Sequence, residues 1–384
     1  MLMTLVVLVI LASVIVQFQA DTNLLVRASR YRQEKVQCTY AAESGMIIGS
    51  HLIQEVFKKP VTTSLAAEGT GEVTNLNPYG DPNDPNAFSD PNDPNSGSMQ
   101  LTAADPESPF LVYKKTIEVG EATVEIEIHD ENAKWPMLWV LTSPFENDRD
   151  GKLTRANLKL LGDWLGAEGE VMQEAAELTR ELGKKIKIPT SDITVATTKS
   201  RSSDGKTTAK SSRSRRTVQK KRIGYQKRLA ERDSRYLAMG QFASQWQDAI
   251  LHTAEYEVLK KEMRQEEPVL EYLGIWGNTK VNVNNASAEV LQAALEPVGI
   301  TADVAQAIVE QRKTKPIGTI TALNDLLPSD NQLREALGSL ADVKSDTFSI
   351  HVTARLGRTH KTLIAGAFVD DRGRVKKTGT IPGE

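Results

Sequence analysis

The sequence contains very little cysteine and histidine. Cys38 is the only cysteine in 384 residues, so an intrachain disulfide and a cysteine-based metal centre are both excluded. The five histidines are scattered, and none has the HxxxH or HExxH spacing that places two metal ligands on one helical face. These absences argue against a disulfide-stapled domain and against a histidine-ligated catalytic metal.

Sequence motifs of common catalytic sites are also missing. The chain has no GxSxG, no Walker-type glycine loop and no Cys–His arrangement. Carboxylates are numerous, but no pair is set apart by its surroundings. We therefore expect no enzymatic activity.

The chain has no overall positive charge. Its formal net charge is −3, whereas nucleic-acid-binding domains are usually strongly basic. Basic residues are concentrated locally, between Lys199 and Arg228, where Asp204 is the only acid. The Ser, Thr, Lys and Arg composition predicts a disordered basic linker at 190–225. Such a run is either a solvated loop or a contact for phosphate on nucleic acid or anionic lipid.

The N-terminal region lacks helix breakers. No Gly or Pro precedes Gly45, so one helix is predicted from Met1 to about Lys58, a rod of about 85 Å. Its first part is apolar and predicts a transmembrane helix at 1–20. The anchoring residues would include Leu2, Leu5, Leu8, Leu11 and Ile15.

Two other interpretations of this apolar run stay open. A cleaved signal peptide is opposed by the absence of Lys and Arg before the run and by the poor cleavage site Phe18-Gln19-Ala20. The basic residues that follow the run, from Arg27 to Lys35, would by the positive-inside rule place the body in the cytoplasm.

The soluble continuation of the helix, residues 21–60, has one face of small and apolar residues. Its members follow a 4-3-4-3-4 spacing: Cys38, Ala42, Gly45, Gly49, Leu52 and Val56. Small residues allow another backbone to approach closely, so this face is expected to pack against a sheet.

The sheet itself is predicted from alternating patterns. Two β-rich runs, Phe110 to Val119 and Ala122 to His129, form a hairpin within residues 109–140. The last part of the chain, 346–384, contains two more strands, about Thr347 to Leu356 and Lys361 to Val369. A helical domain at 145–345 interrupts the sheet.

Two segments contain oxygen ligands that suit Ca²⁺. Residues 61–108 form an Asp/Asn/Pro-rich loop in which DPNDPN occurs twice, and a plain solvated loop is the alternative. Glu146, Asp148 and Asp150 occupy positions 1, 3 and 5 of an EF-hand-like loop. Asn157 stands at the twelfth position in place of the bidentate Glu, so the segment is also interpretable as a helix N-cap.

Residues 278–340 have the pattern of a helix-hairpin-helix unit. Such hairpins bind DNA phosphate through a Gly-hydrophobic-Gly turn, but here the turn is Gly299-Ile300-Thr301. The hairpin is also acidic, with no Lys or Arg from Ala286 until Arg312. A small helical packing unit fits better, and a membrane-anchored DNA receptor of the competence type is the alternative.

Several stretches in this order resemble one protein family. These are "CTYAAESGMIIGSHLI", "IEIHDENAK", "KVNVNNASAEVLQAAL" and "FSIHVTARLG". Together with the apolar N-terminus they resemble protein K of the type II secretion system, the large minor pseudopilin.

The resemblance implies a fold, a location and partners. It implies an α+β pseudopilin fold, in which a long N-terminal helix packs on an antiparallel sheet, with a large inserted α-helical domain. It further implies a single-pass inner-membrane protein with a periplasmic body, which caps the pseudopilus tip with other minor pseudopilins. Calcium is the only cofactor that the family suggests, and the prepilin peptidase would be a processing partner.

Two features bear on this resemblance. The first glutamate is Glu34, whereas most pseudopilins have one near the start of the mature helix. A subunit at the tip has no neighbour above it to pair with such a carboxylate in lipid, so its absence fits a cap. The basic leader ending in Gly that the peptidase recognises is not in the sequence.

Overall fold

A computed structural model describes most of the chain. The described backbone covers residues 2–58, 110–145, 148, 151–167, 169–188, 215–265, 268–325, 331–370 and 373–383. Within these ranges, the side chains of 2–10, 12, 56–58, 215–233 and a few single positions are not described. The loop predicted at 61–108 lies outside the described residues.

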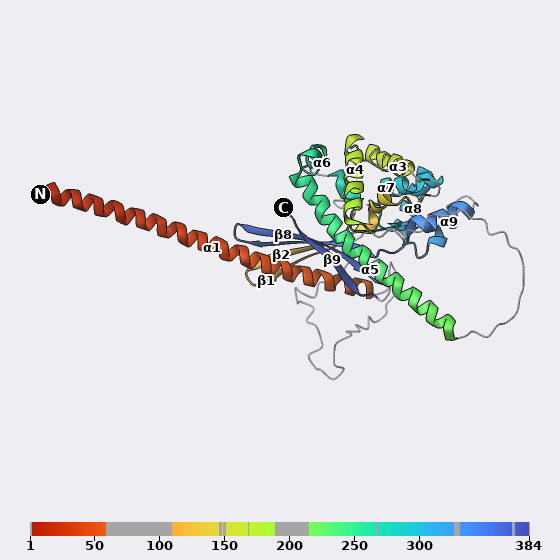
Figure 1. Cartoon of the computed structure of the whole chain (residues 1–384), viewed down its shortest axis with the longest axis horizontal. Helices are drawn as coiled ribbons and strands as arrows, with labels where there is room; N and C mark the ends of the chain where they lie inside the picture. The colour runs from red at the N-terminus through yellow and green to blue at the C-terminus, as the bar shows by residue number, and fades with distance from the viewer. Residues whose placement is uncertain are drawn as a thin grey trace, which may run out of the picture.

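The N-terminal helix is long and continuous. Helix α1 spans Leu2–Lys58 and extends well beyond the rest of the molecule, with the N-terminus at its far end (Figure 1). Every described side chain from Leu11 to Gln33 is exposed, and burial begins near Cys38. The helix therefore consists of a free N-terminal half and a C-terminal half that packs on the body.

One antiparallel sheet forms the centre of the body, in the order β1-β2-β7-β8-β9. Its strands are β1 (Leu111–Val119), β2 (Ala122–Asp130), β7 (Thr347–Leu356), β8 (Thr359–Val369) and β9 (Val375–Pro382). The first hairpin is separated from the other three strands by more than two hundred residues of chain. Even so, β2 and β7 pair directly, with Ile126 opposite Val352.

Helix α1 covers one face of this sheet. The alternating apolar residues of β2 and β7, such as Val124, Ile126, Ile350 and Val352, are buried against it. Burial of a Val or Ile side chain contributes about 1.5–3 kcal/mol, so this layer fixes the register of the central strands.

The chain between β2 and β7 forms the inserted helical unit. Its α-helices are α2 (Leu138–Leu141), α3 (Lys152–Trp164), α4 (Gly169–Ile186), α5 (Arg215–His252), α6 (Glu257–Glu262), α7 (Ala288–Leu295), α8 (Ala302–Thr314) and α9 (Asn331–Leu340). Two short parallel pairs, β3 (Trp135–Pro136) with β4 (Leu273–Gly274) and β5 (Val281–Asn282) with β6 (Ala341–Asp342), connect distant parts of the unit. The fold class predicted from the sequence is confirmed.

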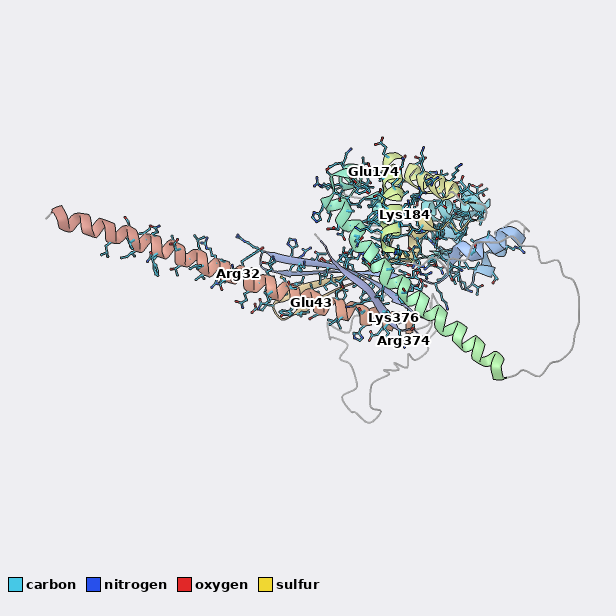
Figure 2. All side chains as sticks on the ribbon, in the orientation of Figure 1. Arg32, Glu43, Glu174, Lys184, Arg374 and Lys376 are labelled. Atoms are coloured by element: carbon cyan, nitrogen blue, oxygen red, sulfur yellow. The ribbon has the colours of Figure 1, made fainter. Side chains whose placement is uncertain are left out.

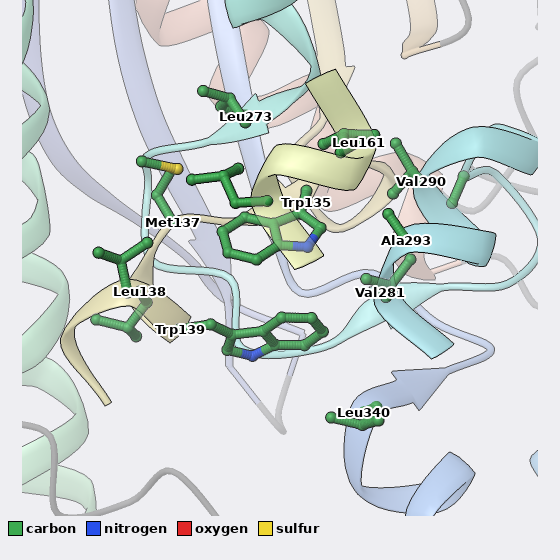
Figure 3. Close-up of a cluster of buried hydrophobic side chains, with 14 of the residues drawn as sticks. Trp135, Met137, Leu138, Trp139, Leu161, Leu273, Val281, Val290, Ala293 and Leu340 are labelled. Atoms are coloured by element: carbon green, nitrogen blue, oxygen red, sulfur yellow. The ribbon is translucent and has the colours of Figure 1, made fainter. Parts of the chain in front are cut away.

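The helical unit has its own hydrophobic core. Trp135 and Trp139 lie at its centre with their rings edge to face, 5.5 Å between centroids, near Leu161 on α3 and Val290 on α7 (Figure 3). The indole N–H of Trp135 donates to Asn157 Oδ1 at 2.8 Å, so the buried ring leaves no polar atom without a partner.

Helix α5 connects the helical unit to the sheet. It crosses β9 on the face opposite α1, where the ring of Tyr236 stacks on Phe368 with 3.6 Å between centroids (Figure 1). Gly240 and Gly379 meet at the crossing, where a Cβ on Gly379 would lie 3.3 Å from the Gly240 Cα. The sheet is thus covered by a helix on both faces.

Some elements differ from what the sequence pattern predicts. Residues 135–140, assigned to the sheet region, lie in the core of the helical unit. The backbone of 215–225, expected to be part of a disordered linker, forms the first turns of α5. Lys, Arg and Gln are good helix formers, which explains how a stretch so rich in charge continues the helix.

Candidate assembly surface

The sheet-facing side of α1 contains the small residues singled out in the sequence. Cys38 and Ala42 have no exposed surface, and Leu52 is 7% exposed. A Cβ on Gly45 would lie 2.6 Å from Val352 Cγ1, and one on Gly49 would lie 2.7 Å from Ile350 Cγ2. The helix backbone therefore rests directly on the strands. The side chain of Val56 lies outside the described residues.

Cys38 marks the start of this contact. Its Sγ lies 3.6 Å from the carbonyl oxygen of Thr359, at the beginning of β8. Burial raises the pKa of the thiol, although a backbone hydrogen bond from Leu356 opposes this. A buried thiol with a raised pKa is a packing residue rather than a reactive one.

The opposite side of α1 presents an apolar stripe to solvent. Its members and exposed fractions are Leu11 57%, Phe18 72%, Leu25 71%, Val36 52%, Tyr40 66% and Ile47 57%. Their spacing of 7, 7, 11, 4 and 7 residues keeps them on one face. Val36 is nine residues from Gly45, two and a half turns, so the stripe lies opposite the sheet contact. We call these six residues the α1 stripe.

Sequence reasoning missed the α1 stripe, although the periodic signal was present. The small-residue face gives the stronger local signal, because small residues at helical spacing predict close packing. The second apolar face becomes significant only when the sheet is known to occupy the first. Large apolar residues that face solvent in a row along a helix indicate a surface for another apolar partner.

The predicted membrane anchor is only partly described. The side chains of Leu2, Leu5 and Leu8 are outside the description, while Leu11 and Ile15 are exposed. Within the described part of the chain, no helix has both the length and the apolar character needed to cross a bilayer.

The polar junction between the sheet and the helical unit has Asp130 at its centre. Its Oδ2 accepts hydrogen bonds from Asn285 Nδ2 at 2.6 Å, Ser345 Oγ at 2.5 Å and Asn282 Nδ2 at 3.2 Å. Burial raises the pKa of this carboxyl, and the hydrogen bonds oppose the rise only in part. The stretches "HDENAK" and "VNVNNAS", far apart in sequence, thus form one network.

Asn132 and Asn278 extend the junction. Asn132 Oδ1 accepts from the backbone N–H of Thr347 at 2.9 Å, which fixes the start of β7 beside the end of β2. Asn278 Nδ2 donates to the Glu131 carbonyl at 2.7 Å. Strand pairing stops where the chain passes from the sheet into the helical unit. There, side-chain amides form hydrogen bonds with the backbone groups that no longer have a partner strand.

Of the three residues proposed as calcium ligands, Asp148 is described. It accepts hydrogen bonds from the N–H groups of Leu153 and Thr154 at 2.9 Å and from two hydroxyl groups, those of Thr154 and Ser143. Burial raises its pKa, but the sum of these hydrogen bonds lowers it below the ordinary value. This is the geometry of a carboxylate at the N-terminus of α3.

Calcium binding at this loop stays a prediction. Glu146 and Asp150 lie outside the described residues. Within the part of the chain that the structure describes, no group of three or more His, Cys, Asp or Glu residues is placed to hold a metal ion.

The hairpin-like unit is built as a packing element. Gly299 adopts φ 86° at the turn, and Val290, Leu291, Ile300 and Ile308 are buried. Arg312, in the last turn of α8, donates to the carbonyl oxygens of Val283 at 2.8 Å and Ala286 at 2.5 Å. Burial lowers its pKa. Its guanidinium therefore stabilises backbone and is not presented to phosphate.

Comparison with protein families identifies this part of the chain. Residues 281–344 match the family model described as "Type II secretion system (T2SS), protein K". The predicted resemblance to protein K is confirmed. The matched segment runs from β5 to the loop before β7, so it contains the hairpin-like unit and part of the polar junction.

Wider comparisons add a distant structural likeness. A chain of the crystal structure of the GspK-GspI-GspJ complex from enterotoxigenic Escherichia coli is similar at 14% identity and a TM-score of 0.47. The similarity covers 93% of this chain and 99% of that one. Among curated proteins, none matches this sequence significantly.

Proposed function

We propose that this chain is a minor pseudopilin of a type II secretion system, which caps the tip of the pseudopilus with other minor pseudopilins during export of folded proteins. The observation that carries the proposal is the α1 stripe. It runs along the free half of the helix and continues beside the sheet, interrupted on the same face by Ser29 and the exposed Glu43, so that a largely apolar helix can pack along it.

The proposed mechanism is mechanical rather than catalytic. Residues 1–20 anchor the helix in the inner membrane, the body lies in the periplasm, and a prepilin peptidase processes the chain if a leader exists upstream. Two features support a position at the tip. The apolar run contains no glutamate for a subunit above to pair with. The helical unit, α5 included, enlarges the body well beyond what the sheet needs for its own core.

The α1 stripe is the part to test. Tyr40→Glu and Ile47→Glu each place a charge on a side chain that already faces solvent, so the fold should be kept. Co-expression with the other minor pseudopilins of the same secretion system, followed by affinity purification of the complex, should show their loss from both variants. Gln37→Glu adds the same charge at a half-buried position beside the α1 stripe, about 60° round the helix from Tyr40, and serves as the matched control. Partners retained by the stripe variants would refute the proposal.

A further inference from the structure

Four basic residues follow the apolar run of α1. Arg27, Arg30, Arg32 and Lys35 are all exposed, and they lie between the predicted anchor and the first residues that pack on the sheet. Figure 2 shows Arg32 on this part of the helix, on the side of the body from which the N-terminal half extends. The assembly proposed above assigns no role to them.

These residues lie on two sides of the helix. At 100° per residue, Arg27 and Arg30 lie 60° apart on one side of the helix, and Arg32 and Lys35 lie 60° apart on a different side, about 140° away. A protein partner that contacts one side of α1 would meet one or two of them. A planar surface through which the helix passes would meet all four.

Their charge is only partly offset by neighbours in the described part of the chain, which include the exposed Asp21 at the end of the predicted span. Glu34 is the acid within the stretch, and its Oε2 accepts a hydrogen bond from Thr359 Oγ1 at 3.2 Å, on the sheet side. The turn between β7 and β8 lies against it and adds the exposed Arg358. The neighbouring turn between β1 and β2 contributes Glu121. The end of the body that faces the anchor is therefore basic overall.

The distances along α1 match the headgroup layer of a bilayer. If the span ends near residue 20, Arg27 lies about 10 Å and Arg30 about 15 Å beyond the hydrocarbon. The headgroup layer is about 5–8 Å thick, and screened attraction extends a further 8–10 Å. Helical side chains also tilt toward the N-terminus, here toward the membrane. Arg27 and Arg30 can thus contact headgroups. The backbone positions of Arg32 and Lys35, about 18 and 22 Å out, lie at and beyond the limit of the screened attraction, so their contribution is smaller.

We propose that Arg27, Arg30, Arg32 and Lys35 form a basic collar that binds the phosphate groups of anionic phospholipid at the membrane face next to the body. The inference rests on the membrane anchoring proposed above. The collar sets the depth at which α1 leaves the bilayer, and through the rigid helix it sets the height of the sheet above the membrane.

The test uses the full chain in nanodiscs of phosphatidylcholine with a minority of phosphatidylglycerol. Spin-labelled lipids report how much the protein prefers phosphatidylglycerol over phosphatidylcholine. Arg27→Gln with Arg30→Gln should lower this preference about fivefold, the effect of roughly one basic side chain at the surface. Arg32→Gln with Lys35→Gln should lower it less, and high salt should weaken the preference of the unsubstituted chain.

A charge-matched control lies on the body. Lys184→Gln with Lys185→Gln removes the same charge from exposed positions of α4 and should leave the preference unchanged (Figure 2). An unchanged preference in both collar variants, or an equal loss in the α4 variant, would overturn the collar. Flotation with vesicles after carbonate washing separates the two proposals. A chain that inserts but shows no lipid preference refutes the collar alone, and a chain that does not insert refutes the anchoring and the collar with it.

Discussion

Glycine at positions 45 and 49 determines how closely α1 approaches the sheet. Glycine inside a helix costs about 0.8–1 kcal/mol relative to alanine. Here this cost is offset by the close packing of the helix backbone on the strands, which occupy the space that a Cβ would need. In contrast, Gly338 in α9 has no atom within 4 Å of the position that its Cβ would take. Glycines in two helices of one chain therefore have different physical roles.

Alanine substitution distinguishes these roles. We expect Gly49→Ala to destabilise the protein by about 1–3 kcal/mol, because its Cβ would overlap Ile350. Gly338→Ala should be neutral or stabilise by up to about 1 kcal/mol. Urea unfolding followed by circular dichroism would compare the two. Equal effects of the two substitutions would contradict the direct contact between α1 and the sheet.

His351 is expected to make the stability of the fold depend on pH. Burial, and then the nearby charges of His129 and Lys134, hold its pKa well below the ordinary 6.5, while Glu127 opposes them. The rings of His129 and His351 are 4.4 Å apart. Above pH 6.5 neither the folded nor the unfolded state takes up this proton. Below it only the unfolded state does, and stability is lost as pH falls.

The expected slope is at most about 1.4 kcal/mol per pH unit from this group. The free energy of unfolding should fall between pH 6.5 and 5 in the unsubstituted protein and fall less steeply in His351→Gln. His252→Gln, at an exposed position of α5, should keep the original slope. Parallel slopes for all three proteins would exclude His351 as the source.

At the scale of elements, the polar junction joins two bodies with separate cores. The sheet core and the helical core have no described residue in common, and the chain crosses between them at β2 to β3 and again before β7. Asp130 receives donors from both crossing points. The position of the helical unit on the sheet therefore depends on hydrogen bonds as well as on the α5 contact.

Asp130→Ala should destabilise the protein by at least about 3 kcal/mol, because Asn282, Asn285 and Ser345 lose their acceptor. Thermal unfolding should also separate into two transitions as the coupling between the cores weakens. Asp163→Ala, on the exposed face of α3, should change stability by less than about 0.5 kcal/mol. A single transition with unchanged midpoint in Asp130→Ala would show that the junction is not needed for coupling.

At the scale of the whole molecule, α1 has two independent halves. Side chains described between Leu11 and Gln33 contact solvent, whereas Cys38, Ala41 and Ala42 belong to the sheet core. The same helix thus presents its surface to partners at one end and completes a core at the other.

Truncation should reveal this division. Removal of residues 2–26 should leave the thermal midpoint of the body unchanged, because no described contact of the body is lost. Removal of residues 2–42 should lower the midpoint strongly, since three fully or almost fully buried residues are deleted from the core. Similar midpoints for the two truncated chains would contradict the division.

The local sequence predicted the regular elements because each has a periodic pattern of its own. The uninterrupted helix before Gly45, the alternating residues of β2 and the hairpin-like unit are all determined over short distances. Strand β9 was not predicted, because the pattern in "VKKTGTIP" is weak and the strand is formed by pairing with β8. For the same reason, nothing local indicated that Trp135 would leave the sheet and enter the helical core.

The sequence by itself determined the type of protein: a long apolar-tipped helix, a sheet interrupted by helices, and a resemblance to protein K. Only the tertiary structure decided which surfaces are free, because a residue's exposure depends on partners that are distant in sequence. The sheet covers the Gly45 face of α1 and leaves the Tyr40 face open. Likewise Asp148, a candidate metal ligand in the sequence, lies with its carboxylate on the N-terminus of α3.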